Sequence, residues 1–243
     1  MGRTDNIKAS YRRWMESYRC RKQYSTMERV PFYEVAGRFL PSHGTATIVD
    51  IGSGDGLFVR HLKLDDRYER VFLLDSNPEA VKHLSSLYAN VVAYTAPERL
   101  PFEDEAVDYI HCSHMMEHLD PLELYTFVKE IDRVLSPGGS LVISTPLLWT
   151  RFYDDLSHVK PYNPDVFSHY LCKSVAPRSR QVISDRYALA EIVYRYSMPD
   201  LTEGWGSDRM FVDFPMQAWK FFLLKLGIKK AVKNGYTMVL KKM

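Results

Sequence analysis

Short apolar runs alternate with helix-like stretches through the middle of the chain. The runs have the length of β-strands and lie at Ala46–Ile51, Val71–Leu74, Val91–Tyr94, Val107–Cys112 and Ser140–Ser144. The stretches between them carry the apolar spacing of helices and lie at Leu57–Leu64, Pro78–Tyr88 and Leu122–Leu135. Strands that alternate with helices over such short distances form parallel sheets with right-handed crossovers. The pattern therefore predicts an α/β fold built on a mostly parallel sheet.

The flanks of this core are less regular. Their patterns predict two more helices and two more strands, at Met27–Leu40, Pro164–Cys172, Tyr187–Tyr196 and Tyr236–Leu240. The turn Ser136-Pro137-Gly138-Gly139 is expected to precede the fifth strand. We expect a single domain over residues 1–243 with four parts, namely a helical cap at 1–43, a core at 44–146, an acceptor-site segment at 147–185 and an insertion at 198–234.

Composition narrows the class of protein without naming it. A hydrophobic share of 46% with 26% charged residues is ordinary for a globular protein, and a net charge of +2 gives no reason to expect a nucleic-acid partner. The three cysteines lie far apart, which argues against a disulfide framework or a zinc site. No stretch has the apolar run of a signal peptide or a membrane span, so the expected location is cytoplasmic.

The sharpest chemical signal is the sequence VDIGSGDG at residues 49–56, where the first strand meets a helix. Glycines there let the backbone turn tightly and approach a ligand that a Cβ would exclude. Asp75 ends the second strand about twenty residues further on, where a carboxylate can accept both hydroxyls of a ribose. Asp50 and Asp55 bring negative charge to the turn. That charge disfavours the pyrophosphate of NAD and favours S-adenosylmethionine (SAM), which carries an amine and a sulfonium.

Four motifs in order give the chain a family resemblance. They are VDIGSGDG, LLDSNPEAV, LPFEDEAVDYIHCSHMMEHL and VLSPGGSLVISTP, and together they cover about residues 46–145. In these motifs the chain resembles the class I SAM-dependent methyltransferases of types 11 and 23, especially the group that includes ubiquinone and sugar methyltransferases. The resemblance implies a Rossmann-like, seven-stranded, mainly parallel sheet with helices on both faces and an antiparallel last strand. It also implies SAM as the cofactor of the core.

The resemblance assigns contacts to that cofactor. Asp50, Gly52 and Gly54 would line its methionine end, Asp75 would hold the ribose, and Ser76 would lie beside the adenine. The acidic residue that the family often uses for the adenine amine is replaced by alanine here, so a nearby glutamate or backbone groups must serve. The complete expected set is Asp50, Gly52, Ser53, Gly54, Asp75, Ser76, Ala96, Pro97, Glu98 and Ser113.

Residues for the transfer itself are expected in two loops. A hydroxyl acceptor needs a general base, because its neutral oxygen is a poor nucleophile. The stretch DDLSHVKPY at residues 154–162 resembles the D-x-x-H-V-x-x-Y pattern of methyltransferases of polysaccharide and glycolipid biosynthesis. It suggests His158 as the base, paired with Asp155, and His114 after the fourth strand is a second candidate. Bracing of a loop is the alternative for Asp155 and His158; as ligands these residues are too few to assign a metal site.

Together these features suggest O-methylation of a sugar or glycan hydroxyl. One alternative is a methyltransferase of a small quinone- or lipid-like metabolite, and another is a catalytically silent SAM-binding module. The expected partner is a small-molecule or glycan acceptor, with no nucleic acid. A helix at about 215–233, with Trp219, Phe222 and Leu226 on one face, is a candidate contact for a second subunit or a membrane surface.

Overall fold

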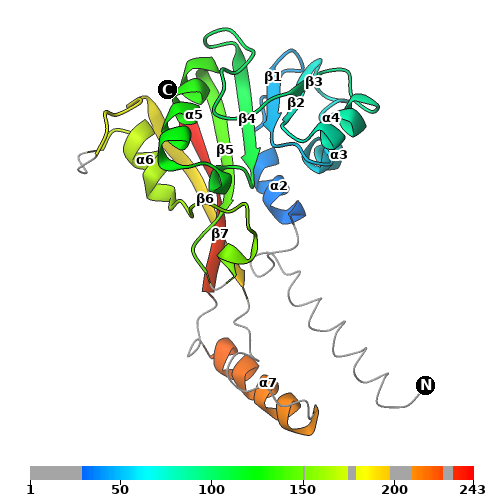
Figure 1. Ribbon diagram of the computed structural model, residues 1–243, viewed down its shortest axis with the longest axis vertical. Helices are drawn as coiled ribbons and strands as arrows, with labels where there is room; N and C mark the ends of the chain where they lie inside the picture. The colour runs from blue at the N-terminus through cyan, green and yellow to red at the C-terminus, as the bar shows by residue number, and fades with distance from the viewer. Residues whose placement is uncertain (1–28, 150, 175–178, 198–209, 227–231) are drawn as a thin grey trace. The chain divides into compact units, whose positions relative to one another are not determined.

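A computed structural model of the protein describes residues 29–149, 151–174, 179–197, 210–226 and 232–243 (Figure 1). Their strands form a seven-stranded sheet in the order β3-β2-β1-β4-β5-β7-β6. The strands are β1 Thr47–Ile51, β2 Arg70–Asp75, β3 Val91–Ala93, β4 Val107–Ser113, β5 Leu135–Pro146, β6 Tyr187–Ser197 and β7 Val232–Lys242. Strands β1 to β5 pair in parallel, and β7 runs antiparallel to β5. The predicted α/β class and the antiparallel last strand are confirmed.

The helices connect these strands, as the apolar spacing predicts. They are α2 Val30–Gly37, α3 Leu57–Leu62, α4 Pro78–Ser85, α5 Pro121–Val134, α6 Pro164–Leu171 and α7 Met210–Lys225, with short 3-10 turns η1 Met116–His118 and η2 Phe152–Asp154. In Figure 1, α3 and α4 lie beside the β1–β3 half of the sheet, whereas α5 and α6 lie beside the β5–β7 half.

Local sequence explains where two of these helices begin. The Asn77 side chain accepts a hydrogen bond from the Glu79 backbone N–H at the start of α4, and Asp120 and Glu123 form a reciprocal capping box at the start of α5. A proline follows each cap, where its missing N–H costs nothing. The cap of α5 directly follows η1, so it fixes where the loop after β4 ends.

One face of the sheet packs against α2 and α3. Tyr33 and Ala36 of α2 and Phe58 and Val59 of α3 are buried together with inward-facing strand residues such as Ile48. The Tyr33 and Phe58 rings meet edge to face with centroids 5.4 Å apart. This packing holds the start of α3, and hence the glycine turn before it, against the sheet.

Three boundaries differ from the sequence prediction. Helix α2 spans Val30–Gly37 within the described residues, and the rest of the predicted cap, up to residue 28, lies outside them. The predicted turn at Ser136–Gly139 is part of β5, with a shift of register opposite Val107 and Tyr109 and a positive φ of 82° at Gly138. Helix α7 begins at Met210 and carries Pro215 inside it.

The described residues fall into two compact units. One comprises residues 29–193 and 235–243 and holds every residue of the predicted site, and the other lies within residues 194–234 and contains α7. No helix in the described parts of the chain has the length and apolar character needed to cross a membrane.

Candidate functional site

The glycine turn between β1 and α3 needs its glycines for backbone conformation. Gly52, Gly54 and Gly56 have φ values of 75°, 56° and 71°, a region that residues with a Cβ rarely adopt. The Gly52 and Ser53 N–H groups donate to the Leu74 carbonyl at 2.8 and 3.1 Å, which ties the end of β1 to the end of β2. A Cβ at Gly54 would meet no atom within 4 Å, so this part of the turn faces open space. The turn therefore presents bare backbone to a ligand.

Asp75 lies beside that turn at the end of β2, as predicted. Its Oδ2 accepts a hydrogen bond from the Gly54 N–H at 2.7 Å, and its Oδ1 accepts one from the Asn77 N–H at 2.8 Å. The residue is partly exposed, and Ser76 next to it is exposed. Each carboxylate oxygen keeps a second lone pair, so Asp75 can hold the turn and still accept hydrogen bonds from a diol.

Asp50 has surroundings that the sequence did not indicate. Its side chain is buried, and its Oδ1 lies 2.7 Å from Nδ1 of His111, the neighbouring residue on β4. The Phe58 ring stacks on His111 with centroids 3.7 Å apart. Among the described residues, Asp50 Oδ2 and His111 Nε2 have no hydrogen-bond partner. An unpartnered carboxylate oxygen directly before the glycine turn suits a cationic ligand group.

The remaining predicted cofactor residues lie in the glycine turn, at the end of β4 and in the loop after β3. Ser53 and Ser113 are buried, and Ser53 Oγ donates to the Asp50 carbonyl at 2.8 Å. Ala96 and Pro97 are half-buried and Glu98 is exposed, in the loop after β3. The Tyr94 hydroxyl donates to the Glu98 carbonyl at 2.8 Å and shapes that loop.

A histidine–carboxylate pair stands directly after β4. His114 has a positive φ of 55°, and its Nδ1 lies 3.0 Å from Oε1 of the fully buried Glu117. The Thr145 hydroxyl donates to the other carboxylate oxygen at 3.0 Å. Burial acts to raise the pKa of Glu117, but the hydrogen bond and positive charge of His114 lower the pKa below its ordinary value overall. Glu117 is thus an ionised acceptor that orients the His114 ring.

This pair adjoins the glycine turn. A Cβ built on Gly52 would lie 3.5 Å from Met115 Cβ and 3.7 Å from the Ser113 carbonyl. The loop after β4 therefore packs on the turn at the carboxyl ends of the parallel strands, where ligands bind in such sheets.

Asp155 and His158, which were expected to pair, are not joined by a hydrogen bond. His158 Nδ1 donates to the Phe152 carbonyl at 2.6 Å, because η2 presents that oxygen to the ring. Asp155 Oδ1 instead accepts from the Ser157 N–H at 2.9 Å and the Ser157 hydroxyl at 2.6 Å, and these bonds lower the pKa of Asp155. A short aspartate side chain folds back on the residue two positions later more readily than it reaches across a loop.

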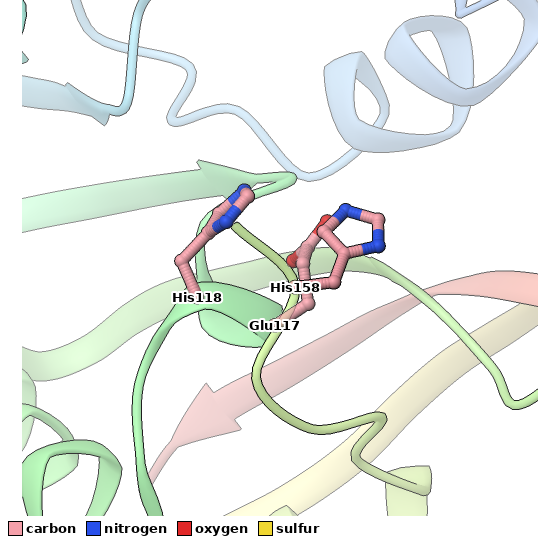
Figure 2. A group of neighbouring side chains, drawn as sticks. All are labelled: Glu117, His118 and His158. Atoms are coloured by element: carbon pink, nitrogen blue, oxygen red, sulfur yellow. The ribbon is translucent and has the colours of Figure 1, made fainter. Parts of the chain in front are cut away.

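His158 has other neighbours, which Figure 2 shows. Glu117, His118 and His158 come together from two loops, and one potential ligand atom from each lies within 4.8 Å of the others. His118 Nδ1 donates to the Ser157 carbonyl at 3.0 Å, and the His118 and His158 ring centroids are 5.1 Å apart. Glu117 is not among the site residues that the sequence predicts. The spacing of His114, Glu117 and His118, three and four positions along one short turn, is the signal that could have indicated it.

Comparisons with known proteins agree with this geometry. The methyltransferase domain family matches residues 49–143, which carry the glycine turn, Asp75 and the whole loop after β4. The structure of a SAM-dependent methyltransferase from Archaeoglobus fulgidus superposes with a TM-score of 0.59 at 22% identity, covering 88% of this chain and 95% of that one. The match supports a class I SAM-dependent methyltransferase core at residues 49–143 with SAM as its cofactor, and the superposition shows the same fold.

Curated relatives match over shorter stretches. A malonyl-[acyl-carrier protein] O-methyltransferase from Hahella chejuensis is 31% identical over 108 residues, which are 43% of this chain and 38% of the relative. An Arabidopsis thaliana protein named a probable pectin methyltransferase is 30% identical over 135 residues, which are 54% of this chain and 19% of the relative. The chain thus spans well under half the length of these relatives, and their names point to different acceptors.

Proposed function

We propose that this chain transfers the methyl group of SAM to a hydroxyl oxygen of a sugar or glycan. The observation that carries the SAM half is the turn of positive-φ glycines beside the Asp75 carboxylate, within the matched methyltransferase domain. When bound, SAM supplies an electrophilic methyl group on a sulfonium. The chain's own residues bind that cofactor, align the acceptor and exclude water.

Each cofactor residue has a role that its contacts support. Asp75 accepts the ribose hydroxyls with lone pairs left over from its two backbone hydrogen bonds. Asp50 supplies negative charge that favours the amine from a buried position, with His111 holding its Oδ1. Gly54 lets the backbone approach the methionine end, and Ala96, Pro97 and Glu98 line the adenine side. The carboxylates of Asp75 and Asp50 suit a cofactor with net positive charge.

Proton removal from the hydroxyl falls to the histidines beside this turn. Glu117 accepts from His114 Nδ1, so in the neutral form of the ring the lone pair is on Nε2. The Phe152 carbonyl fixes His158 in the same tautomer, in place of the predicted Asp155. As the methyl–oxygen bond forms and the methyl–sulfur bond breaks, one of these Nε2 atoms takes the hydroxyl proton.

The acceptor class rests on the loop at residues 147–162. It carries an exposed aromatic ring, Tyr153, and the exposed polar side chains of Asp154, Asp155 and Ser157, which are groups that bind sugars by stacking and hydrogen bonding. The pectin name of the Arabidopsis relative is in line with a polysaccharide acceptor.

A quinone- or lipid-like metabolite is the second candidate. Leu148, Leu156 and Val159 in the same loop expose 64%, 103% and 50% of their surface, which would favour an apolar acceptor. A panel of sugar nucleotides, oligosaccharides and quinols with radiolabelled SAM separates the two. Methylation of quinols alone would overturn the glycan assignment.

Calorimetric titration of the full chain with SAM tests the core of the proposal. Asp75→Asn is expected to weaken SAM binding by about 10- to 100-fold, because a charged hydrogen-bond acceptor is worth about 1.5–3 kcal/mol. Asp66→Ala, an exposed carboxylate between α3 and β2, should bind as wild type. NADH should give no heat. Folded protein that does not bind SAM would refute the function, while SAM binding without transfer to any acceptor would favour the silent module.

We also propose that α7 contacts a second copy of this chain. Trp219 and Phe222 stack with ring centroids 5.7 Å apart and expose 60% and 50% of their surface. Sedimentation velocity should show a dimer that Trp219→Ser with Phe222→Ser dissociates. Binding of the monomer to anionic vesicles would instead support the membrane surface.

A further inference from the structure

Three side chains beside the predicted acceptor region form a donor set that methyl transfer alone does not require. His118 and Glu117 come from η1 after β4, and His158 comes from the loop after β5 (Figure 2). One ligand atom from each lies within 4.8 Å of the other two. Two imidazoles and one carboxylate are the ligands of many catalytic zinc sites and of non-haem iron sites.

Both histidines are already fixed by backbone carbonyls. His118 Nδ1 donates to the Ser157 carbonyl at 3.0 Å, and His158 Nδ1 donates to the Phe152 carbonyl at 2.6 Å. A ring that donates from Nδ1 carries its lone pair on Nε2, and the same second hydrogen bond is typical of metal-bound histidine. The half-buried rings are therefore held in the tautomer that binds a metal.

The Glu117 carboxylate is also held in place by hydrogen bonds. Glu117 is fully buried, and Thr145 and His114 each donate to one of its oxygens. Each oxygen retains a lone pair beyond these hydrogen bonds, and carboxylates that bind metals are themselves hydrogen-bonded.

The backbone joins the two loops that supply the ligands. The Val159 and Lys160 N–H groups both donate to the Glu117 carbonyl, at 2.8 and 3.1 Å. The Tyr162 hydroxyl donates to the Leu119 carbonyl at 2.8 Å. These hydrogen bonds join the loop after β4 to the loop after β5. The three side chains are therefore neighbours without a metal.

We propose that Glu117, His118 and His158 bind one divalent first-row transition-metal ion, of the zinc or cobalt type, and that an open coordination position holds the acceptor hydroxyl. The role at the acceptor rests on the proposed methyl transfer, whereas metal binding itself does not. Imidazole donors favour such ions over Mg²⁺, which prefers an all-oxygen shell. Bonds of about 2.0–2.1 Å would draw the donor atoms together through small rotations of the two histidine side chains.

A bound metal changes the roles of the neighbouring histidines. His158 Nε2 would then be a ligand, so the hydroxyl proton passes to His114, which is not part of the donor set. A metal held by Glu117, His118 and His158 would make a bound hydroxyl more acidic.

Titration of the chelator-treated full chain with Co²⁺ tests this site by its visible absorption. The wild type should bind one equivalent, and Zn²⁺ should displace it. His118→Gln and His158→Gln should each weaken binding by at least about 100-fold, because loss of an outer-shell partner alone costs 10- to 100-fold. His83→Gln, an exposed histidine on α4, should bind as wild type. Circular dichroism shows that each variant is folded.

Two results would overturn the metal site. One is a folded wild type that binds no stoichiometric Co²⁺ or Zn²⁺. The other is binding that both site variants retain. SAM calorimetry on the same metal-free protein keeps this proposal separate from the function, since SAM binding without metal binding would refute the metal site alone.

Discussion

Asp50 and Asp75 lie near the ends of neighbouring parallel strands, yet their side chains differ in exposure and in hydrogen-bond partners. Asp75 is pinned by two backbone N–H groups and remains partly exposed, as a ligand contact requires. Asp50 is buried against His111, and the aromatic ring of Phe58 covers that pair. A carboxylate and an imidazole in a dry interior depend on each other, because either one alone would lack its main partner.

Removal of Asp50 tests this dependence. Asp50→Ala is expected to lower the free energy of unfolding by about 3–5 kcal/mol, because it leaves the His111 ring buried without its acceptor. Arg38→Ala, which breaks the exposed ion pair to Glu191, should cost no more than about 1 kcal/mol. Urea unfolding measures both. Equal losses in the two variants would mean that Asp50 and His111 contribute no special stability.

His114 offers a catalytic test at the same scale. Asparagine tolerates the positive φ of 55° at this position, so His114→Asn removes the base and spares the backbone. The methyl-transfer rate should fall by about 10²–10⁴-fold with the Kd for SAM unchanged. Single-turnover transfer to an acceptor from the panel measures it, with His83→Gln as control. An unchanged rate would exclude His114 as the base.

The positions of the proposed cofactor residues follow from the sequence more directly than the hydrogen-bond partners of the proposed catalytic ones, for a physical reason. The glycine turn and Asp75 are fixed by where strands end, and strand ends can be inferred from apolar runs. The partner of a loop histidine depends on which oxygen comes within about 3 Å of it. His158 illustrates this, because the Phe152 carbonyl reaches its ring and the Asp155 carboxylate turns to Ser157.

At the scale of elements, the sequence predicted the positions of the strands closely but not the irregular start of β5. Apolar runs gave β1, β2 and β4 to within one residue, because buried strands of a parallel sheet are mostly apolar. Ser136–Gly139 has the composition of a turn, yet Leu135 before it and Ser140 after it both pair with β4, so it lies within β5 as an irregular segment. Local composition reports backbone preference, and tertiary pairing can override it.

The cap of α5 gives a prediction for an element. Asp120 Oδ1 accepts from the Leu122 and Glu123 N–H groups at 2.7 and 2.9 Å. Asp120→Ala should therefore cost about 0.5–2 kcal/mol of unfolding free energy. Asn163 stands at the same position of α6 but makes no side-chain cap bond, so Asn163→Ala is a matched control with a smaller effect. Thermal unfolding compares the two, and an equal loss would show that the capping box adds nothing.

For the larger of the two units as a whole, the site is where distant segments converge. The turn after β1, the end of β2 and the loops after β4 and β5 all lie at the carboxyl ends of parallel strands. Their side chains come from residues about a hundred positions apart, which parallel pairing with helical crossovers makes unavoidable. The sheet thus explains why the residues proposed to bind the cofactor, the acceptor and the metal are neighbours.

Buried tyrosines make the stability of this unit sensitive to high pH. Burial raises the pKa of Tyr162 to about 12, and it also raises the pKa values of Tyr94, Tyr109 and Tyr187. An unfolded tyrosine ionises near pH 10, so the neutral native phenol contributes stability below about pH 10 that is lost as the pH rises toward 12. Unfolding free energy should therefore fall across that window.

Tyr162→Phe isolates one part of that fall. The variant should lose about 1 kcal/mol near neutral pH, because its hydroxyl no longer donates to the Leu119 carbonyl. Between pH 10 and 12 its unfolding free energy should decline less steeply than that of the wild type, because one fewer native proton is released on unfolding. Tyr153→Phe changes an exposed ring and should leave the slope as it is. Urea unfolding at a series of pH values gives both slopes, and an unchanged slope for Tyr162→Phe would show that this phenol ionises as freely in the folded protein as in the unfolded chain.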